Sequence, residues 1–186
     1  MEASIELLSY VVSGLAIFVL LGLYVSWRAT RLDRLHGRVE AARAALDAAL
    51  VRRAAAALEL AASGLLDPAT SLLLAGAAHE ARAAGEDRRE LAESDLSRAL
   101  RAAFGQPDFR ARLADRDGGA LVEELDAAAT KVLLARRFYN DAVAATRTSR
   151  RRWLVRALRL AGHAAMPAFF EIDDVPPDNG PDADTA

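Results

Sequence analysis

His79 and Glu80 are the most enzyme-like pair of neighbours in this sequence. A metalloprotease helix carries His-Glu followed by a second histidine four residues after the first, and here that position is Ala83. The other two histidines, His36 and His163, lie far away along the chain and supply no predictable third metal ligand. We therefore expect no metal, no cofactor and no catalytic residue. The alternative function is an uncharacterised, hydrolase-like membrane-associated enzyme with a site near His79 and Glu80.

A second polar group, Arg-Arg-Phe-Tyr-Asn-Asp at residues 136–141, needs a structural reason, because Asn and Asp are mediocre residues in the middle of a helix. Buried or half-buried, they would form hydrogen bonds to a neighbouring helix. We expect Arg52 or Arg53 to meet Asn140 or Asp141 in a clasp between the first and last helices of the bundle. The alternative is a docking patch for a protein partner. Both interpretations use the same residues: Arg52, Arg53, Arg136, Arg137, Tyr139, Asn140 and Asp141.

The composition favours a helical protein and excludes several classes of enzyme. Ala, Leu, Arg and Glu are strong helix formers, and they dominate the sequence after residue 28. The absence of cysteine excludes a disulfide framework, a thiol nucleophile and a thiolate metal site. The sequence also contains no Gly-rich phosphate loop and no nucleophile elbow. We expect an all-α fold.

Residues 7–27 contain no charged side chain, and a helix of that length reaches about 31 Å, enough to cross the hydrocarbon core of a bilayer. A cleaved secretory signal is the rival interpretation, but it needs a basic start and a short apolar core. This start instead carries Glu2 and Glu6. The sequence therefore predicts a single transmembrane helix over residues 7–27.

The charges beside the predicted span set its orientation, because Lys and Arg mark the cytoplasmic side of a membrane. None precedes the span, whereas five basic residues follow it: Arg28, Arg31, Arg34, Arg38 and Arg43. We expect a single-pass protein of the cell (inner) membrane with its N-terminus outside and its bulk in the cytoplasm. Small residues four apart, Ser9 with Ser13 and Gly22 with Ser26, also allow a homo-oligomer through the span.

Glycine and proline divide the rest of the chain into helices, with interruptions near Gly64, Gly85, Gly105 and Pro107. The predicted helices cover residues 28–62, 68–84, 88–104 and 120–161, with a helical turn or two at 108–114. Alternating three- and four-residue spacing of apolar side chains in the first and last of these helices predicts that the two helices pair. The stripes are Leu32, Leu35, Val39, Ala42, Leu46 and Ala49, and Leu121, Leu125, Ala128, Val132, Ala135, Tyr139, Ala142 and Thr146.

The predicted fold is therefore a transmembrane helix that continues without a break into a long antiparallel, four-helix-type cytoplasmic bundle. The predicted domains are a short extracytoplasmic lead at 1–6, the span at 7–27, the bundle at 28–165 and a C-terminal segment at 166–186. Asp, Pro, Gly and Asn dominate the chain from about residue 173, so we expect an acidic, disordered tail there.

Up-and-down order would return the basic end of the last helix to the inner membrane face. An amphipathic basic helix with a tryptophan suits contact with anionic lipid. The alternative is a solvated basic face at a helix C-terminus, where Arg complements the helix dipole. Nucleic acid is not an expected partner, because no recognisable binding fold accompanies the patch. The residues concerned are Arg147, Arg150, Arg151, Arg152, Trp153, Arg156 and Arg159.

Four blocks of sequence resemble the LemA family of bacterial membrane-anchored helical proteins. In chain order they are residues 38–53 with paired Arg52-Arg53, the His79-Glu80 pair, Leu-Ala-Arg-Arg-Phe-Tyr-Asn-Asp-Ala-Val at 134–143, and Phe-Phe-Glu at 169–171. Residues 54–62 and the turn at 106–109 depart from the family pattern, as in a divergent branch. The resemblance implies an N-terminal anchor, a long antiparallel helical bundle and no established catalytic activity.

From the residues and the resemblance we expect a non-enzymatic interaction or scaffold protein at the cytoplasmic membrane face, with a protein partner that the sequence does not identify. A deep pocket gathering His79, Glu80 and another titratable group would favour the enzyme instead.

Overall fold

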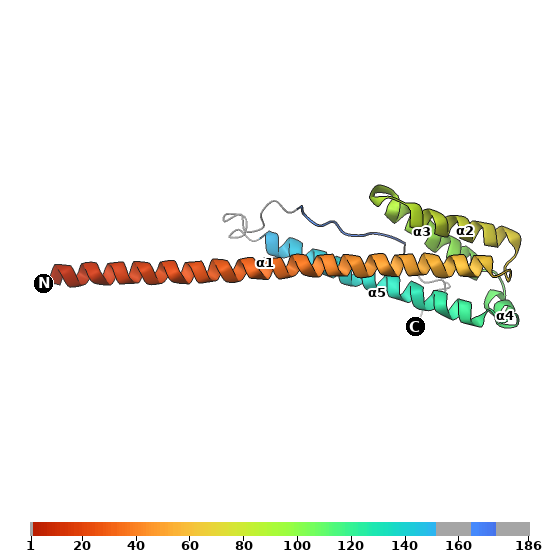
Figure 1. Ribbon diagram of the computed structural model, residues 1–186, viewed down its shortest axis with the longest axis horizontal. Coiled ribbons are helices and arrows are strands. Elements are labelled where there is room, and N and C mark those ends of the chain that lie inside the picture. The colour runs from red at the N-terminus through yellow and green to blue at the C-terminus, as the bar shows by residue number, and fades with distance from the viewer. Residues whose placement is uncertain (1, 152–164, 174–186) are drawn as a thin grey trace, which may run out of the picture. The chain divides into compact units, whose positions relative to one another are not determined.

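The computed structural model describes residues 2–151 and 165–173, except the side chains of residues 2–9, 11, 28, 29 and 32. Every regular element in this part of the chain is a helix, which confirms the predicted all-α class (Figure 1). The helices are α1 (Glu2–Ala62), α2 (Pro68–Ala83), α3 (Glu86–Phe104), α4 (Phe109–Ala114) and α5 (Gly119–Arg150). Residues 174–186, where we predicted disorder, lie outside the described part.

Contacts between Cα atoms group the chain into two compact units. The first unit comprises Met1–Glu40 and Ala142–Pro167, and the second comprises Ala41–Asp141 and Ala168–Ala186. Both long helices, α1 and α5, pass from one unit into the other. The domain borders expected after residues 6, 27 and 165 stay a prediction.

Helix α1 is unbroken from Glu2 to Ala62, as predicted for a span that continues directly into the bundle. Among the residues whose side chains are described, no helix is both long and apolar enough to cross a membrane. The transmembrane helix at residues 7–27 thus stays a prediction.

The helix ends in the second unit follow local sequence signals. The Ser63 hydroxyl donates to the Leu60 carbonyl oxygen (2.8 Å), and Gly64 adopts a positive φ of 74°, so α1 stops there. The Asp67 carboxylate caps α2 by accepting from the backbone N–H groups of Ala69 and Thr70. Hydrogen bonds from Thr70 hold the pKa of Asp67 below its ordinary value.

Helices α2 and α3 form an antiparallel hairpin around Gly85. Helix α3 begins at Glu86, two residues earlier than predicted, because Glu86 and Asp87 are favourable next to the positive end of the helix dipole. After α3, Asp108 takes a left-handed backbone conformation (φ 54°) and α4 turns the chain towards α5. The aromatic rings of Phe104 and Phe109 pack at this corner with 4.8 Å between their centroids.

The core of the second unit is built from leucines at the centre and alanines between helices. Leu60 on α1, Leu74 on α2, Leu96 on α3 and Leu125 on α5 are all fully buried. Figure 1 shows α1 and α3 running one way and α2 and α5 the other in this unit, which is the expected up-and-down order. Small alanine side chains at the contacts allow the helices to approach closely.

In the first unit, Val39, Ala142 and Thr146 of the predicted stripes are buried, and so are Val143 and Ser149, which lie outside the stripes. Val39 is 9% exposed, and Val143 and Thr146 are fully buried. The Thr146 hydroxyl donates to the Ala142 carbonyl oxygen (2.9 Å), so its burial leaves no unpaired donor. The described side chains of the two stripes are all buried or half-buried, as the heptad spacing predicted.

The predicted last helix reached residue 161, and α5 is described as far as Arg150. Arg147 and Arg150 are half-buried and Arg151 is exposed. The Arg150 guanidinium donates to the Ala165 carbonyl oxygen (2.9 Å). The other members of the predicted lipid-contact patch lie outside the described residues: Arg152, Trp153, Arg156 and Arg159.

Candidate functional site

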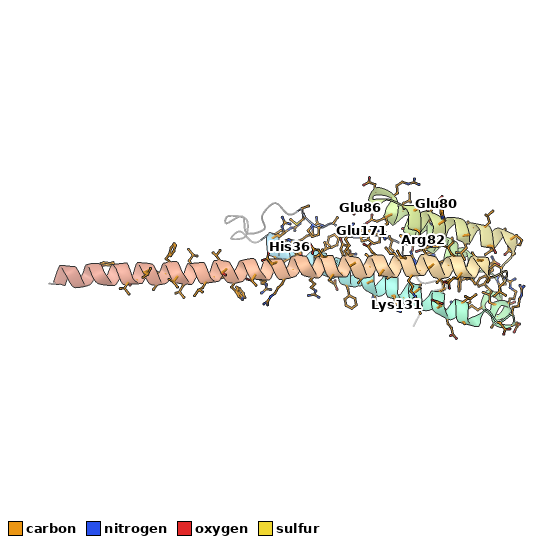
Figure 2. All side chains as sticks on the ribbon, viewed as in Figure 1. His36, Glu80, Arg82, Glu86, Lys131 and Glu171 are labelled. Atoms are coloured by element: carbon orange, nitrogen blue, oxygen red, sulfur yellow. The ribbon has the colours of Figure 1, made fainter. Side chains whose placement is uncertain are left out.

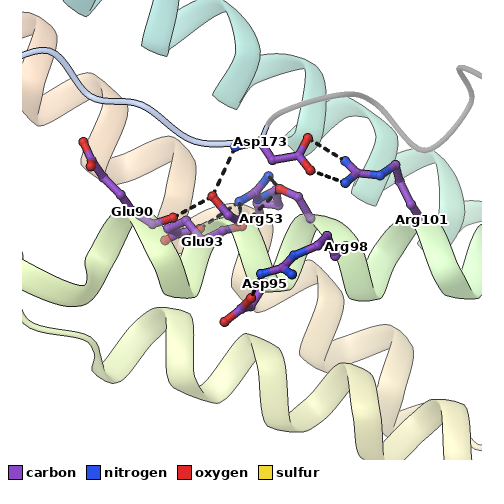
Figure 3. Close-up of polar contacts among 9 residues, drawn as sticks. Arg53, Glu90, Glu93, Asp95, Arg98, Arg101 and Asp173 are labelled. Carbon is purple, nitrogen blue, oxygen red and sulfur yellow. Dashed lines mark hydrogen bonds and ion pairs between the residues drawn. The ribbon is translucent and has the colours of Figure 1, made fainter.

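The second unit contains a charged pair inside its core. The side chains of Arg53 on α1 and Glu93 on α3 are 3% and 2% exposed, and a 2.8 Å ion pair joins Arg53 Nη2 to Glu93 Oε2 (Figure 3). Arg53 also donates to the Ser97 hydroxyl (2.9 Å) and to the Glu93 carbonyl oxygen (3.1 Å). Removing two charges from water is costly unless they satisfy each other, so this pair fixes how α1 and α3 meet.

Burial raises the pKa of Glu93, and the positive charges of Arg53 and Arg89 offset only part of that rise. Arg89 lies next to the pair and forms a 3.4 Å ion pair with Asp47. The Nε atoms of Arg53 and Arg89 are buried without a hydrogen-bond partner. Arg53 and Glu93 are almost completely covered, so a substrate cannot contact them. The pair instead favours one packing arrangement of α1 against α3.

A short C-terminal segment, residues 168–173, lies across α5 and α3, and we call it the strap. On α5 the Tyr139 hydroxyl donates to the Ala168 carbonyl oxygen (2.9 Å). The Asn140 side chain bonds both ways to the backbone of Phe170, donating from Nδ2 to its carbonyl oxygen (3.0 Å) and accepting from its N–H at Oδ1 (2.9 Å). One amide side chain thus satisfies both backbone polar groups of one strap residue, Phe170.

Helix α3 holds the second half of the strap. The Glu90 carboxylate accepts from the Glu171 N–H (2.9 Å), and the Ser94 hydroxyl oxygen accepts from the Asp173 N–H (3.1 Å). The Asp173 carboxylate forms a two-point pair with the Arg101 guanidinium, one arm being 2.9 Å (Figure 3). The strap is therefore ordered as far as Asp173, the residue from which we expected disorder.

The predicted clasp pairs the wrong residues. Arg52 contacts Glu124 at 2.7 Å and Arg53 contacts Glu93, while Asn140 binds the strap. Since α1 and α5 are antiparallel and Arg52 lies level with Glu124, Asn140 lies about 24 Å further along α5, beyond the reach of any arginine on that turn of α1.

The remaining residues of the predicted set are spread along α5 without forming a joint site with Arg52 or Arg53. Arg136 is half-buried, whereas Arg137 and Asp141 are exposed. The strap had only one sequence signal, the Phe-Phe-Glu block at 169–171, and that block gives no indication of where it binds.

The pair considered for an enzyme is on the outer surface of α2. His79 and Glu80 are both exposed (Figure 2 labels Glu80). Glu80 lines an open depression together with Asp95 and Arg98, and His79 is not among its lining residues. Among the described residues, no group of three or more histidine and acidic side chains could hold a metal ion.

An apolar groove runs between α1 and α5 in the second unit, with a volume of about 430 Å³. Alanines form its floor, and Leu134 and Phe138 form part of its rim with 45% and 63% of their surfaces exposed. Arg52 and the exposed Lys131 give the groove a basic border (Figure 2 labels Lys131). The lining residues are Ala42, Ala45, Ala48, Ala49, Arg52, Lys131, Leu134, Ala135 and Phe138.

No family model, curated protein or solved structure matches this chain. The resemblance to LemA proteins therefore stays a prediction from the residues.

Proposed function

We propose that this chain is a non-enzymatic interaction module of the LemA type, anchored in the cytoplasmic membrane, whose helical bundle binds a protein partner. The observation that carries the proposal is the apolar groove between α1 and α5, where Phe138 is 63% exposed beside a floor of alanines. Exposed large apolar side chains that border a concave apolar surface are typical of protein-binding sites.

The shape and charge of the groove favour a partner helix. Ala42, Ala45 and Ala49 repeat at the spacing of one helix face, and their small side chains leave room for apolar side chains of a third helix. Lys131 and Arg52 on the border favour an acidic residue on that partner. The proposed occupant is thus an amphipathic helix with apolar residues at i, i+3 and i+4 and an acidic flank.

Photo-crosslinking in the native membrane tests this proposal. A benzoylphenylalanine at position 138 should crosslink repeatedly to one helical segment of one partner, and Ala45→Arg should lower that yield about tenfold by placing a charge in the apolar contact. The matched control is the same probe at Leu91, which is 59% exposed on α3. Equal products from both positions, or crosslinks to lipid alone, would contradict a partner site in the groove.

The membrane anchor is supported by the sequence and by the exposure of α1. Residues 7–27 carry no charge, and the described apolar side chains there, including Leu15, Phe18 and Leu20, are 63%, 74% and 65% exposed. A helix whose large apolar side chains point outward over consecutive turns needs an apolar surrounding. The five arginines that follow favour an N-terminus outside and a cytoplasmic bundle.

The basic end of the predicted last helix, residues 147–159, adds a lipid contact to this proposal. Replacing Arg151, Arg152, Arg156 and Arg159 by glutamine should weaken binding of the chain from residue 34 onward to vesicles with anionic lipid, since each arginine near such a surface contributes about 1 kcal/mol. Vesicle flotation measures the bound fraction. The variant has to keep the helicity of the unaltered chain, which circular dichroism measures. Replacing Arg82, Arg88, Arg98 and Arg112 instead is the charge-matched control, and equal loss in both variants would mean that only net charge matters.

A further inference from the structure

The face of α3 and α5 under the strap has the chemistry of a peptide-binding site. It contacts the strap backbone at Ala168, Phe170, Glu171 and Asp173, through side chains from both helices. Contacts to backbone N–H and C=O groups do not depend on which side chains the bound segment carries. The side chain that adds selectivity is Asp173, through its two-point pair with Arg101.

We infer that this face is a receptor site for an extended acidic segment of a partner protein, and that the strap occupies it within the same chain. The required ligand has one residue whose backbone N–H and C=O are both free to pair with Asn140 and, three residues later, a carboxylate for Arg101. This spacing is that of Phe170 and Asp173 in the strap. The strap is a segment that an incoming ligand of the same chemistry can replace.

The strength of the strap's own contacts makes exchange feasible. None of the strap's side chains is fully buried: Phe169 is 38% exposed, Glu171 is exposed, and Phe170 and Ile172 are half-buried, so the strap lies on the surface of the helices and is not part of their core. Each hydrogen bond between strap and helix replaces a hydrogen bond to water, so its net contribution to the free energy of strap binding is modest. Tethering gives the strap a high effective concentration, so a free peptide competes well only when the strap is disabled or the partner is itself held nearby.

This inference concerns a different face from the α1–α5 groove. It does not require that the groove bind a helix or that α1 cross a membrane, so the two proposals can fail separately.

The test uses the full chain with its strap disabled by Phe170→Pro and Asp173→Asn. Proline removes the N–H that Asn140 accepts, and asparagine removes the charge that Arg101 pairs with. A fluorescent peptide of residues 166–173 is titrated into this variant and into the unaltered chain, and binding is followed by anisotropy. The strap-disabled variant should bind the peptide about tenfold or more tightly than the unaltered chain, whose own strap competes.

Three changes test the contacts in the strap-disabled background. Asn140→Ala should weaken peptide binding about tenfold by removing both hydrogen bonds to the backbone of Phe170. Arg101→Gln should weaken binding by a similar factor, and the peptide with Asn in place of Asp173 should lose the same amount. Arg98→Gln is the matched control, because Arg98 is an exposed arginine of α3 paired with Asp95 and does not contact the strap.

Absence of peptide binding by a strap-disabled chain that keeps its native circular dichroism spectrum would overturn the inference. Equal binding by the Asn140→Ala variant would do the same. A dimer of the unaltered chain that disappears when the strap is disabled would identify the occupant as the strap of a second copy, and so overturn the assignment to a separate partner.

Discussion

Replacing Arg53 with methionine is expected to lower the free energy of unfolding by about 3–5 kcal/mol, because it leaves the Glu93 carboxylate buried without its counter-charge. Glu93 is 2% exposed and the ion pair is 2.8 Å long, so water cannot take the place of the guanidinium without opening the contact between α1 and α3. Urea unfolding of the full chain in mild detergent, followed by circular dichroism at 222 nm, measures the loss.

Two further variants show whether the loss of stability comes from the missing charge partner of Glu93 or from lost packing. Arg53→Met combined with Glu93→Leu should recover most of the stability, because a buried ion pair can often be replaced by apolar side chains of similar volume. Ser97 keeps a partner in this variant, since its hydroxyl also donates to the Glu93 backbone carbonyl oxygen. Arg52→Met is the neighbouring control and should cost less than about 1 kcal/mol, because the Arg52–Glu124 pair is exposed.

The pH dependence of the Arg53→Met variant gives an independent check. Burial already raises the pKa of Glu93, and loss of the Arg53 charge raises that pKa further. The folded variant then holds a proton that the unfolded chain releases near the ordinary value of 4.5, so its stability falls as the pH rises through the folded-state pKa. The difference in free energy of unfolding between the variant and the unaltered chain should therefore become smaller when the pH is lowered from 8 to about 5.5. A gap independent of pH would mean that lost packing, not the carboxylate, causes the destabilisation.

Introducing Leu15→Arg together with Leu20→Arg is expected to abolish membrane insertion. An arginine near the centre of a membrane helix costs about 2.5–3.5 kcal/mol of insertion free energy, so two together cost about 5–7 kcal/mol. This cost lowers the ratio of inserted to non-inserted chain by more than about a thousandfold. Both leucines are exposed on α1, so the change removes no described packing contact of the bundle. The measurement is the fraction of the chain that stays with membranes after alkaline carbonate extraction.

The control for this experiment places two arginines elsewhere on the exposed surface. Val51 on α1 and Leu91 on α3 are 49% and 59% exposed, and Val51→Arg with Leu91→Arg should leave the chain in the membrane fraction. If the unaltered chain is itself extracted by carbonate, the predicted span at residues 7–27 is wrong.

Local signals in the sequence predicted the helices well. The end of α1 at Ala62, the cap at Asp67, the start of α2 at Pro68 and the end of α3 at Phe104 all lie where the sequence predicted them. Each depends on residues within one turn, such as a capping carboxylate, a glycine with positive φ or a proline. Heptad spacing likewise identified buried positions, because one face of a helix has to be apolar to pack.

The site depended on contacts between residues far apart in sequence. Arg52 and Arg53 are identical neighbours in the sequence, yet one is exposed beside Glu124 and the other is buried beside Glu93. Which of them enters the core is set by the rotation of α1 against α3, and no single helix contains that information. The predicted clasp failed for the same reason, because pairing with Asn140 required a register between α1 and α5 that the sequence leaves open.

The sequence by itself thus determined the helices, their ends, their apolar faces and the uncharged stretch at residues 7–27, since these follow from short-range chemistry. Only the tertiary structure decided that Arg53 and Glu93 form a buried pair and that Asn140 and Arg101 bind the strap. The strap holds its extended course through hydrogen-bond partners that α3 and α5 supply from at least 29 residues away. Backbone groups of an extended segment find such partners only after the helices have packed.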